Sequence, residues 1–175
     1  MNNYRYILES ERVSDPDFEL IPLIVRMKLD LAGCKISLSQ WQLLPPDIRA
    51  HLIDTELVGP QDIRRFRQYL DGALRAAGCE PSKDLPLDKR GELMTWLDPD
   101  RLPDSLMAQL DEQQLNTNWR ALNTFGRYVV WSLLQKGRLD KLKAVSTESC
   151  LYQDRQTPSP AQRHARAANR TTAIP

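Results

Sequence analysis

The sequence predicts an all-α protein, with a compact domain of several helices and a disordered C-terminal tail. Three observations support this fold class. Apolar residues recur at helical spacing through most of the chain, the seven glycines stand singly as helix caps and turns do, and one pattern of landmark residues occurs twice. A chain of 175 residues is long enough for one domain with a proper core. We therefore expect residues 20–152 to form a single helical domain.

The repeated pattern predicts two degenerate helical repeat units, at about residues 20–57 and 102–137. The landmarks are Pro22, Leu29, Asp30, Trp41, Leu44 and Arg49 in the first unit and Pro103, Leu110, Asp111, Trp119, Leu122 and Arg127 in the second. The spacings from proline to Leu-Asp, from tryptophan to leucine and from tryptophan to arginine agree, while the intervening loop is three residues shorter in the second unit. This agreement indicates an internal duplication.

The first unit begins with a segment that allows two interpretations. From Val25 to Leu31 apolar and charged residues alternate, which together with a turn at Gly33 is typical of a β-hairpin. The matching segment after Pro103 has helical spacing and no alternation. If the two units share a fold, the first segment is a helix too. Its apolar residues then cover two faces, which predicts a central helix that ends at Gly33.

Local start and stop signals predict the other elements. Residues 1–19 are expected to form an extended arm that lays aromatic side chains on the core. Ser39 can cap a short helical turn that carries Trp41, and Pro46 starts the next helix. Further helices are predicted over residues 60–77, 87–97, 124–136 and 138–145. Residues 153–175 are polar, with four arginines against one aspartate, so we expect this basic tail to be disordered.

The composition excludes several classes of partner. The formal net charge of +1 argues against a general affinity for nucleic acid or for an anionic membrane. No apolar run approaches the roughly 18 to 20 residues that a membrane span requires. The N-terminal residues contain no apolar stretch followed by small residues, as a secretory signal would. These observations predict a cytoplasmic protein.

Motifs for catalysis or cofactor binding are missing from the sequence. It contains two histidines and three widely separated cysteines, Cys34, Cys79 and Cys150, with no CxxC or HExxH spacing for a metal. It also lacks a GxGxxG segment, a phosphate-binding Walker loop and a nucleophile elbow. We expect a protein without catalytic residues, bound metal or cofactor, in which the cysteines are free thiols.

Arginines gather on the polar face of the helix predicted over residues 60–77. Arg64, Arg65 and Arg67 could form a patch that binds a phosphate or an acidic partner. The alternative is a solvated face with local ion pairs, which is the usual arrangement on amphipathic helices. We favour the solvated face.

The tryptophans and arginines of the repeat also allow two interpretations. Trp41 and Trp119 could be binding anchors on a surface, but repeated aromatic residues more often fill equivalent core sites. Arg49 and Arg127 could contact a partner, or could pack on the indole and pair with an internal carboxylate such as Asp30 or Asp111. We favour structural roles for all four.

One stretch resembles the signature of the nitrate reductase-associated proteins, a family of small bacterial proteins. The matching residues are Ile21, Pro22, Val25, Arg26, Lys28, Leu29, Asp30, Gly33, Lys35, Leu38, Ser39, Trp41 and Arg49. The second half is similar at Trp96, Leu102, Pro103, Trp119, Leu122, Arg127 and Tyr128. The resemblance covers about residues 18–142, and the motif IPxxVRxKLDxxG carries most of it.

The resemblance implies an accessory protein of cytoplasmic assimilatory nitrate reductase, with the reductase as its protein partner. We expect the contact surface to flank the first unit, at Arg26 and Lys28 and at the arginine face of residues 64–67. The other motif positions, among them Pro22, Gly33 and Tyr128, are expected to be structural. An alternative is a helical adaptor unrelated to nitrate, which uses its basic tail to bind nucleic acid or another acidic partner.

Overall fold

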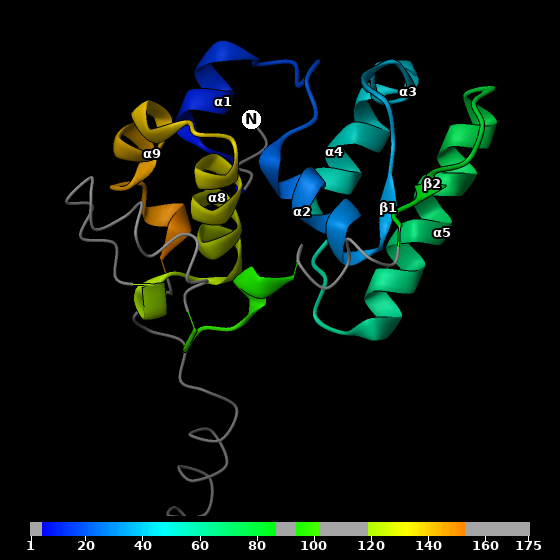
Figure 1. The fold of residues 1–175 in the computed structure, drawn as a ribbon. Coiled ribbons are helices and arrows are strands. Elements are labelled where there is room, and N and C mark those ends of the chain that lie inside the picture. The colour runs from blue at the N-terminus through cyan, green and yellow to red at the C-terminus, as the bar shows by residue number, and fades with distance from the viewer. Residues whose placement is uncertain (1–4, 87–93, 102–118, 153–175) are drawn as a thin grey trace, which may run out of the picture.

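The computed structural model describes residues 5–86, 94–101 and 119–152 (Figure 1). These ranges contain seven α-helices: α1 (Glu9–Ser14), α2 (Leu23–Leu31), α3 (Leu38–Leu43), α4 (Pro46–Asp54), α5 (Pro60–Ala76), α8 (Thr124–Gln135) and α9 (Leu139–Val145). Three short 3-10 helices complete them: η1 (Thr95–Leu97), η2 (Trp119–Ala121) and η3 (Ser149–Leu151). The fold is mostly helical, as predicted.

A small antiparallel sheet corrects the prediction of an all-α fold. Strand β1 (Cys34–Lys35) pairs with β2 (Lys83–Asp84), with Cys34 opposite Asp84. The Leu85 amide extends the pairing by donating to the Gly33 carbonyl. The strands have two residues each, so no alternating pattern marks them in the sequence.

Helix α2 is central, and the hairpin interpretation of its segment is wrong. Ile24, Val25, Met27, Lys28 and Leu29 are all buried, because α2 packs against α4 and α5 on one side and α8 on the other (Figure 1). Gly33 follows with a φ of 63°, the left-handed conformation that ends a helix at little cost for glycine. The alternation of charged residues therefore reflects a helix covered on two faces.

Helix α8 is the second buried element. Every residue from Phe125 to Leu134 is buried, since α8 contacts α2, α9, η1 and η3. Gly126 faces the backbone of η3, and a Cβ at this position would collide with the Leu151 carbonyl. That carbonyl is fixed by the Asn123 amide, which donates to it over 2.9 Å.

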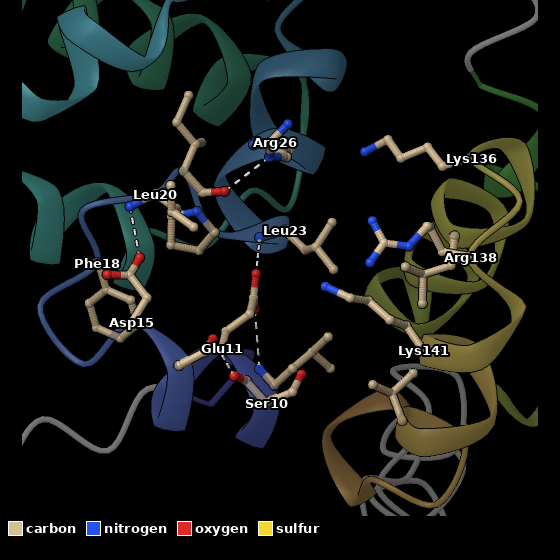
Figure 2. Close-up of a pocket in the computed structure, with 16 residues that line it drawn as sticks. Ser10, Glu11, Asp15, Phe18, Leu20, Leu23, Arg26, Lys136, Arg138 and Lys141 are labelled. Atoms are coloured by element: carbon tan, nitrogen blue, oxygen red, sulfur yellow. Dashed lines mark hydrogen bonds between the residues drawn. The ribbon is translucent and has the colours of Figure 1, made fainter.

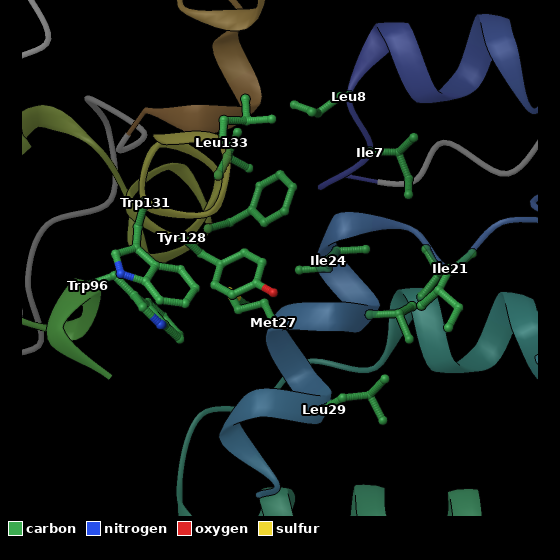
Figure 3. Packing of buried hydrophobic residues seen from close by; sticks show 14 of the residues in the cluster. Ile7, Leu8, Ile21, Ile24, Met27, Leu29, Trp96, Tyr128, Trp131 and Leu133 are labelled. Carbon is green, nitrogen blue, oxygen red and sulfur yellow. The ribbon is translucent and has the colours of Figure 1, made fainter. Parts of the chain in front are cut away.

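One hydrophobic core joins α2 to α8 and η1. In Figure 3 the aromatic side chains of Tyr128 and Trp131 on α8 lie with Trp96, and Ile24 and Met27 approach them from α2. The rings of Trp96 and Tyr128 meet edge to face, with centroids 5.1 Å apart. None of the helices in the described ranges has both the length and the apolar character needed to cross a membrane.

The N-terminal segment differs from the predicted extended arm. Residues 9–14 form α1, because the Glu11 carboxylate reaches back to the Leu8 amide and caps the first turn. Aliphatic side chains precede the helix, and Ile7 and Leu8 are buried in the core. The aromatic side chains of Tyr6 and Phe18 pack against the core and are partly buried.

The cap of α3 also differs from the prediction. Ser37, not Ser39, accepts the Gln40 amide, while the Gln40 side chain accepts the Ser37 amide in return. This reciprocal pair satisfies two amides at the start of the helix, which Ser39 cannot do from inside it.

Several predicted elements lie partly or wholly outside the described residues. They are most of the helix predicted over residues 87–97, the helix after Pro103 and the tail 153–175. The helices predicted over residues 60–77, 124–136 and 138–145 are confirmed as α5, α8 and α9. The two repeat units remain a prediction.

Candidate protein-contact site

Lys28, expected on the contact surface, points into the protein. Its ammonium group donates to the carbonyls of Leu52 and Ile53 over 2.8 and 2.6 Å, at the C-terminal end of α4. Burial lowers the pKa of Lys28 from 10.5 to about 8, against the opposing charges of Asp54 and Glu56. The expectation of a partner contact at Lys28 is therefore wrong. The residue satisfies helix-end carbonyls that would otherwise be buried without donors.

The arginines of α5 divide into an internal and an external group. Arg67 pairs with Asp84 on β2 and with Asp71 one turn along α5, and the bond to Asp84 raises the pKa of Arg67. It therefore ties the helix to the sheet. Arg64 and Arg65 are exposed, and the 3.8 Å pair of Arg65 with Asp62 leaves 74% of the arginine side chain in solvent. These two residues remain available to a partner.

The first tryptophan and arginine of the repeated pattern hold one backbone carbonyl. The indole of Trp41 donates to the Phe18 carbonyl over 2.8 Å, and the Arg49 guanidinium donates to the same oxygen over 2.9 Å. Arg49 also pairs with Glu19 at 3.1 Å. Both Trp41 and Arg49 are buried, so they fix the chain that enters α2. The carboxylate that pairs with Arg49 is the half-exposed Glu19 and not Asp30, because the segment before α2 passes over the guanidinium.

The second tryptophan and arginine also bond to backbone carbonyls of a preceding segment. The indole of Trp119 donates to the Asp98 carbonyl over 2.8 Å. Arg127 donates to the carbonyls of Trp96 and Leu122 over 3.0 and 2.7 Å, and burial lowers its pKa. Its neighbour Tyr128 donates to Asp30 on α2 over 3.0 Å. Burial raises the pKa of both Tyr128 and Asp30, so this hydrogen bond joins α8 to α2 with the phenol protonated.

Two further residues of the motif lie in the interior of the protein. Leu29 and Pro22 are buried, and Pro22 occupies the N-cap position of α2. Pro103 lies outside the described residues.

The Arg26 side chain lies on a different face of α2 from Lys28 and lines a cleft together with three further cations. Lys136, Arg138 and Lys141 extend into this cleft from the end of α8 and the start of α9 (Figure 2). The cleft has a volume of about 320 Å³, and Leu8, Ile21, Leu23, Leu133 and Val145 supply apolar lining. The Arg26 Nε donates to the Ile21 carbonyl over 2.9 Å, which holds the guanidinium at this position. We refer to Arg26, Lys136, Arg138 and Lys141 with their lining as the basic cleft.

A comparison with protein families decides what kind of protein carries these features. The model of the family described as conserved nitrate reductase-associated protein matches residues 6–145. The chain belongs to this family. The match runs from before α1 to the end of α9 and so begins earlier than the resemblance at residues 18–142. Comparisons with curated proteins and with solved structures found no match.

The thiols of this family member are not arranged for metal binding within the part of the chain described. No group of three or more His, Cys, Asp or Glu side chains there could hold a metal ion. Burial raises the pKa of Cys34, and burial with the nearby Glu148 raises that of Cys150 to about 11. Both residues therefore remain protonated thiols at neutral pH, whereas a nucleophile or a metal ligand is a thiolate.

Sequence reasoning missed three of the four cations in the basic cleft. Lys136, Arg138 and Lys141 lie within one short segment, and the spacing KxRxxK was the available signal. Nothing in the sequence placed that segment beside Arg26, which is more than one hundred residues away. The packing of α8 against α2, with α9 against α8, brings the two together.

Proposed function

We propose that this protein is a non-catalytic accessory protein of assimilatory nitrate reductase in the cytoplasm. In this proposal it supports the maturation or the activity of the reductase through direct protein contact. The observation that carries the proposal is membership of the nitrate reductase-associated family over residues 6–145. The absence of recognisable catalytic motifs from the sequence agrees with an accessory role.

The distribution of exposed charge supports a contact role. Lys28 and Arg67 are used inside the protein, whereas Arg26, Arg64 and Arg65 are exposed. Exposed cations at a protein interface increase the rate of encounter with an acidic partner and fix its orientation. We assign the contact to the exposed members of the predicted set, extended by the cations of the basic cleft.

The test is a comparison of cells with and without the gene during growth on nitrate. Nitrate reductase activity, the amount of reductase protein and its molybdenum content are measured in both strains. We expect reductase protein to be present but less active without the gene. Lower molybdenum content would assign the role to maturation, and normal content would assign it to activity. Unchanged activity and growth would contradict the proposal.

The adaptor alternative is tested by deleting residues 153–175. An adaptor that binds through this basic tail would lose its partner on deletion, and its binding would weaken steeply with added salt. We expect the truncated protein to restore reductase activity in the deletion strain as well as the full chain does. Loss of complementation by a truncated protein that is still folded would favour the alternative.

A further inference from the structure

We propose that the basic cleft binds an acidic, extended segment of a protein partner, with carboxylate side chains placed between Arg26 and Lys136. The identity of that partner as nitrate reductase rests on the proposed function. The acidic character of the ligand is inferred from the residues of the cleft alone.

The four cations come from two parts of the fold and converge on one space. Arg26 projects from α2, while Lys136, Arg138 and Lys141 project toward it from the opposite side (Figure 2). Among the described residues, no carboxylate oxygen lies within 4 Å of the charged nitrogens of Arg26, Lys136 or Lys141. Arg138 has only a 3.9 Å contact with Asp140, and both of these side chains are at least half exposed. A site with this concentration of positive charge attracts an anion.

Two carboxylates also line the cleft, but their oxygens are used by backbone amides. Glu11 accepts the amide of Leu23 over 2.8 Å and that of Leu8 over 3.4 Å. Asp15 accepts the amides of Glu19 and Leu20 over 2.9 and 2.7 Å. These bonds hold the loop between α1 and α2. Burial raises the pKa of Glu11, and the positive charge of the nearby Arg26 acts against that rise. Neither carboxylate forms an ion pair within 4 Å with a cation of the cleft among the described residues, so four cations face two carboxylates and the cleft keeps an excess of positive charge.

The mutual repulsion of the cations favours such a ligand. Lys136 has a lowered pKa, because burial and then the charge of Arg26 outweigh the opposing charge of Asp30. Two like charges that face each other across a cleft raise the energy of the empty site. A carboxylate between them removes that repulsion and gains charge-assisted hydrogen bonds.

The shape of the site favours a peptide segment over a small ion. A second cleft of about 270 Å³ adjoins the first and shares Ile21, Arg26 and Lys136 with it. It also contains Asp30, whose carboxylate accepts a hydrogen bond from Tyr128. The two clefts thus continue along the boundary between α2 and α8. Apolar side chains such as Leu23 and Leu133 line the first cleft between its charges. An extended segment that carries both acidic and apolar side chains can use both features, whereas a small inorganic anion uses only the charges.

The first experiment measures binding to purified nitrate reductase at low ionic strength. The cleft variant is Lys136→Glu with Arg138→Glu, and the matched control is Arg75→Glu on α5 with Lys83→Glu on β2, two exposed cations outside the cleft lining. Both double variants change exposed side chains and alter the net charge equally, so circular dichroism should show both folded. We expect the cleft variant to weaken binding at least about tenfold and the control by less than about threefold. If the reductase binds the wild type and the cleft variant equally well, the cleft assignment is wrong while the proposed function stands.

The second experiment tests the cleft without the reductase. An N-acetylated hexaglutamate peptide is titrated into the isotope-labelled full chain and followed by amide chemical shifts. We expect saturable shifts around Arg26 and at residues 136–141 that disappear in the cleft variant. Shifts centred on α5, or the same cleft shifts saturated by sodium nitrate or phosphate at lower concentration, would overturn the peptide assignment. Should the peptide bind the cleft while the reductase binds no form of the protein, the site stands and the proposed function fails.

Discussion

Trp41 with Arg49 and Trp119 with Arg127 form two pairs with the same spacing in sequence and different surroundings in the fold. In both pairs the indole and the guanidinium donate to backbone carbonyls of a segment that precedes them. Arg49 has a carboxylate partner, Glu19, of which 55% of the side chain is exposed. Arg127 bonds to neutral groups, and burial lowers its pKa. Both arginines thus donate to backbone carbonyls, but only the charge of Arg49 is balanced by a carboxylate partner.

The residue before each arginine shows how the surroundings differ. Ile48 is half-buried on α4, whereas Gly126 on α8 lies against the Leu151 carbonyl. The helix of the second pair thus touches the backbone of η3 at this position, whereas α4 carries a half-buried side chain there. We interpret the two pairs as equivalent, similarly buried positions of the proposed repeat, which lie on helices that are covered to different extents. Three predictions test this comparison, and a fourth tests the buried cation Lys28.

The largest effect is expected for Gly126→Ala. The added methyl group would overlap a carbonyl that is already held by the Asn123 amide, so α8 or η3 must shift. We expect the free energy of unfolding to fall by about 3 kcal/mol, the upper end for an overpacked core. Ile48→Ala, at the matching position, should cost about 1 kcal/mol because that side chain is only half-buried. Urea denaturation followed by circular dichroism measures both, and equal losses would show that α8 is no more tightly covered than α4 at this position.

The second-largest difference between the two pairs is expected when each arginine is replaced. Arg127→Met leaves the carbonyls of Trp96 and Leu122 without this donor, and we expect a loss of about 3 kcal/mol. Arg49→Met should cost about 1 kcal/mol, because Trp41 still donates to Phe18 and the Glu19 carboxylate returns to water. Arg127→Lys is the matched control and should recover part of the loss. Urea denaturation measures these losses as well. A larger loss for Arg49→Met than for Arg127→Met would contradict the prediction.

Lys28 is a third buried cation, and its effect depends on pH. Its pKa is lowered from 10.5 to about 8, so below pH 8 the fold must hold a charged ammonium that the unfolded chain keeps in water. Between pH 8 and 10.5 the folded state loses that proton before the unfolded state does. Stability should therefore rise with pH over this window, by at most about 3 kcal/mol.

Lys28→Met provides the control for this pH dependence. The difference in unfolding free energy between wild type and variant should grow in favour of the wild type as the pH rises from 8 to 10.5. A difference that stays constant over the window would show that Lys28 titrates at its ordinary pKa.

The smallest effect is expected for the indole hydrogen bonds. Trp41→Phe and Trp119→Phe each remove one N–H donor to a carbonyl, which should cost about 1 kcal/mol apiece beyond any loss of packing. The shared role of the two indoles predicts similar costs. Thermal and urea unfolding of both variants measures them, and a cost confined to one tryptophan would argue against equivalent positions.

Local signals in the sequence were sufficient for most of the helices. Pro46 and Pro60 start α4 and α5, and Gly33, Gly78 and Gly137 follow helices with φ values of 63°, 74° and 63°. Proline suits a first helical turn and glycine suits a left-handed end, so each signal acts through its own backbone. The same reasoning predicted the central position of α2 from its two apolar faces.

Contacts between distant segments could not be predicted in this way. The β1–β2 pair depends on how the loop after α5 meets the end of α2, and two-residue strands have no sequence signature. The wrong assignment of Lys28 has the same origin. A lysine between apolar residues resembles a surface charge until the end of α4 is placed beside it.

The sequence by itself therefore determined the family and the helical character. Family motifs, caps and periodicity depend on residues that are neighbours along the chain. Only the tertiary structure decided which cations face solvent, which are used internally, and that Arg26 and Lys136 share one cleft. Burial and charge are properties of the surroundings of a side chain, and those surroundings exist only once distant helices have packed together.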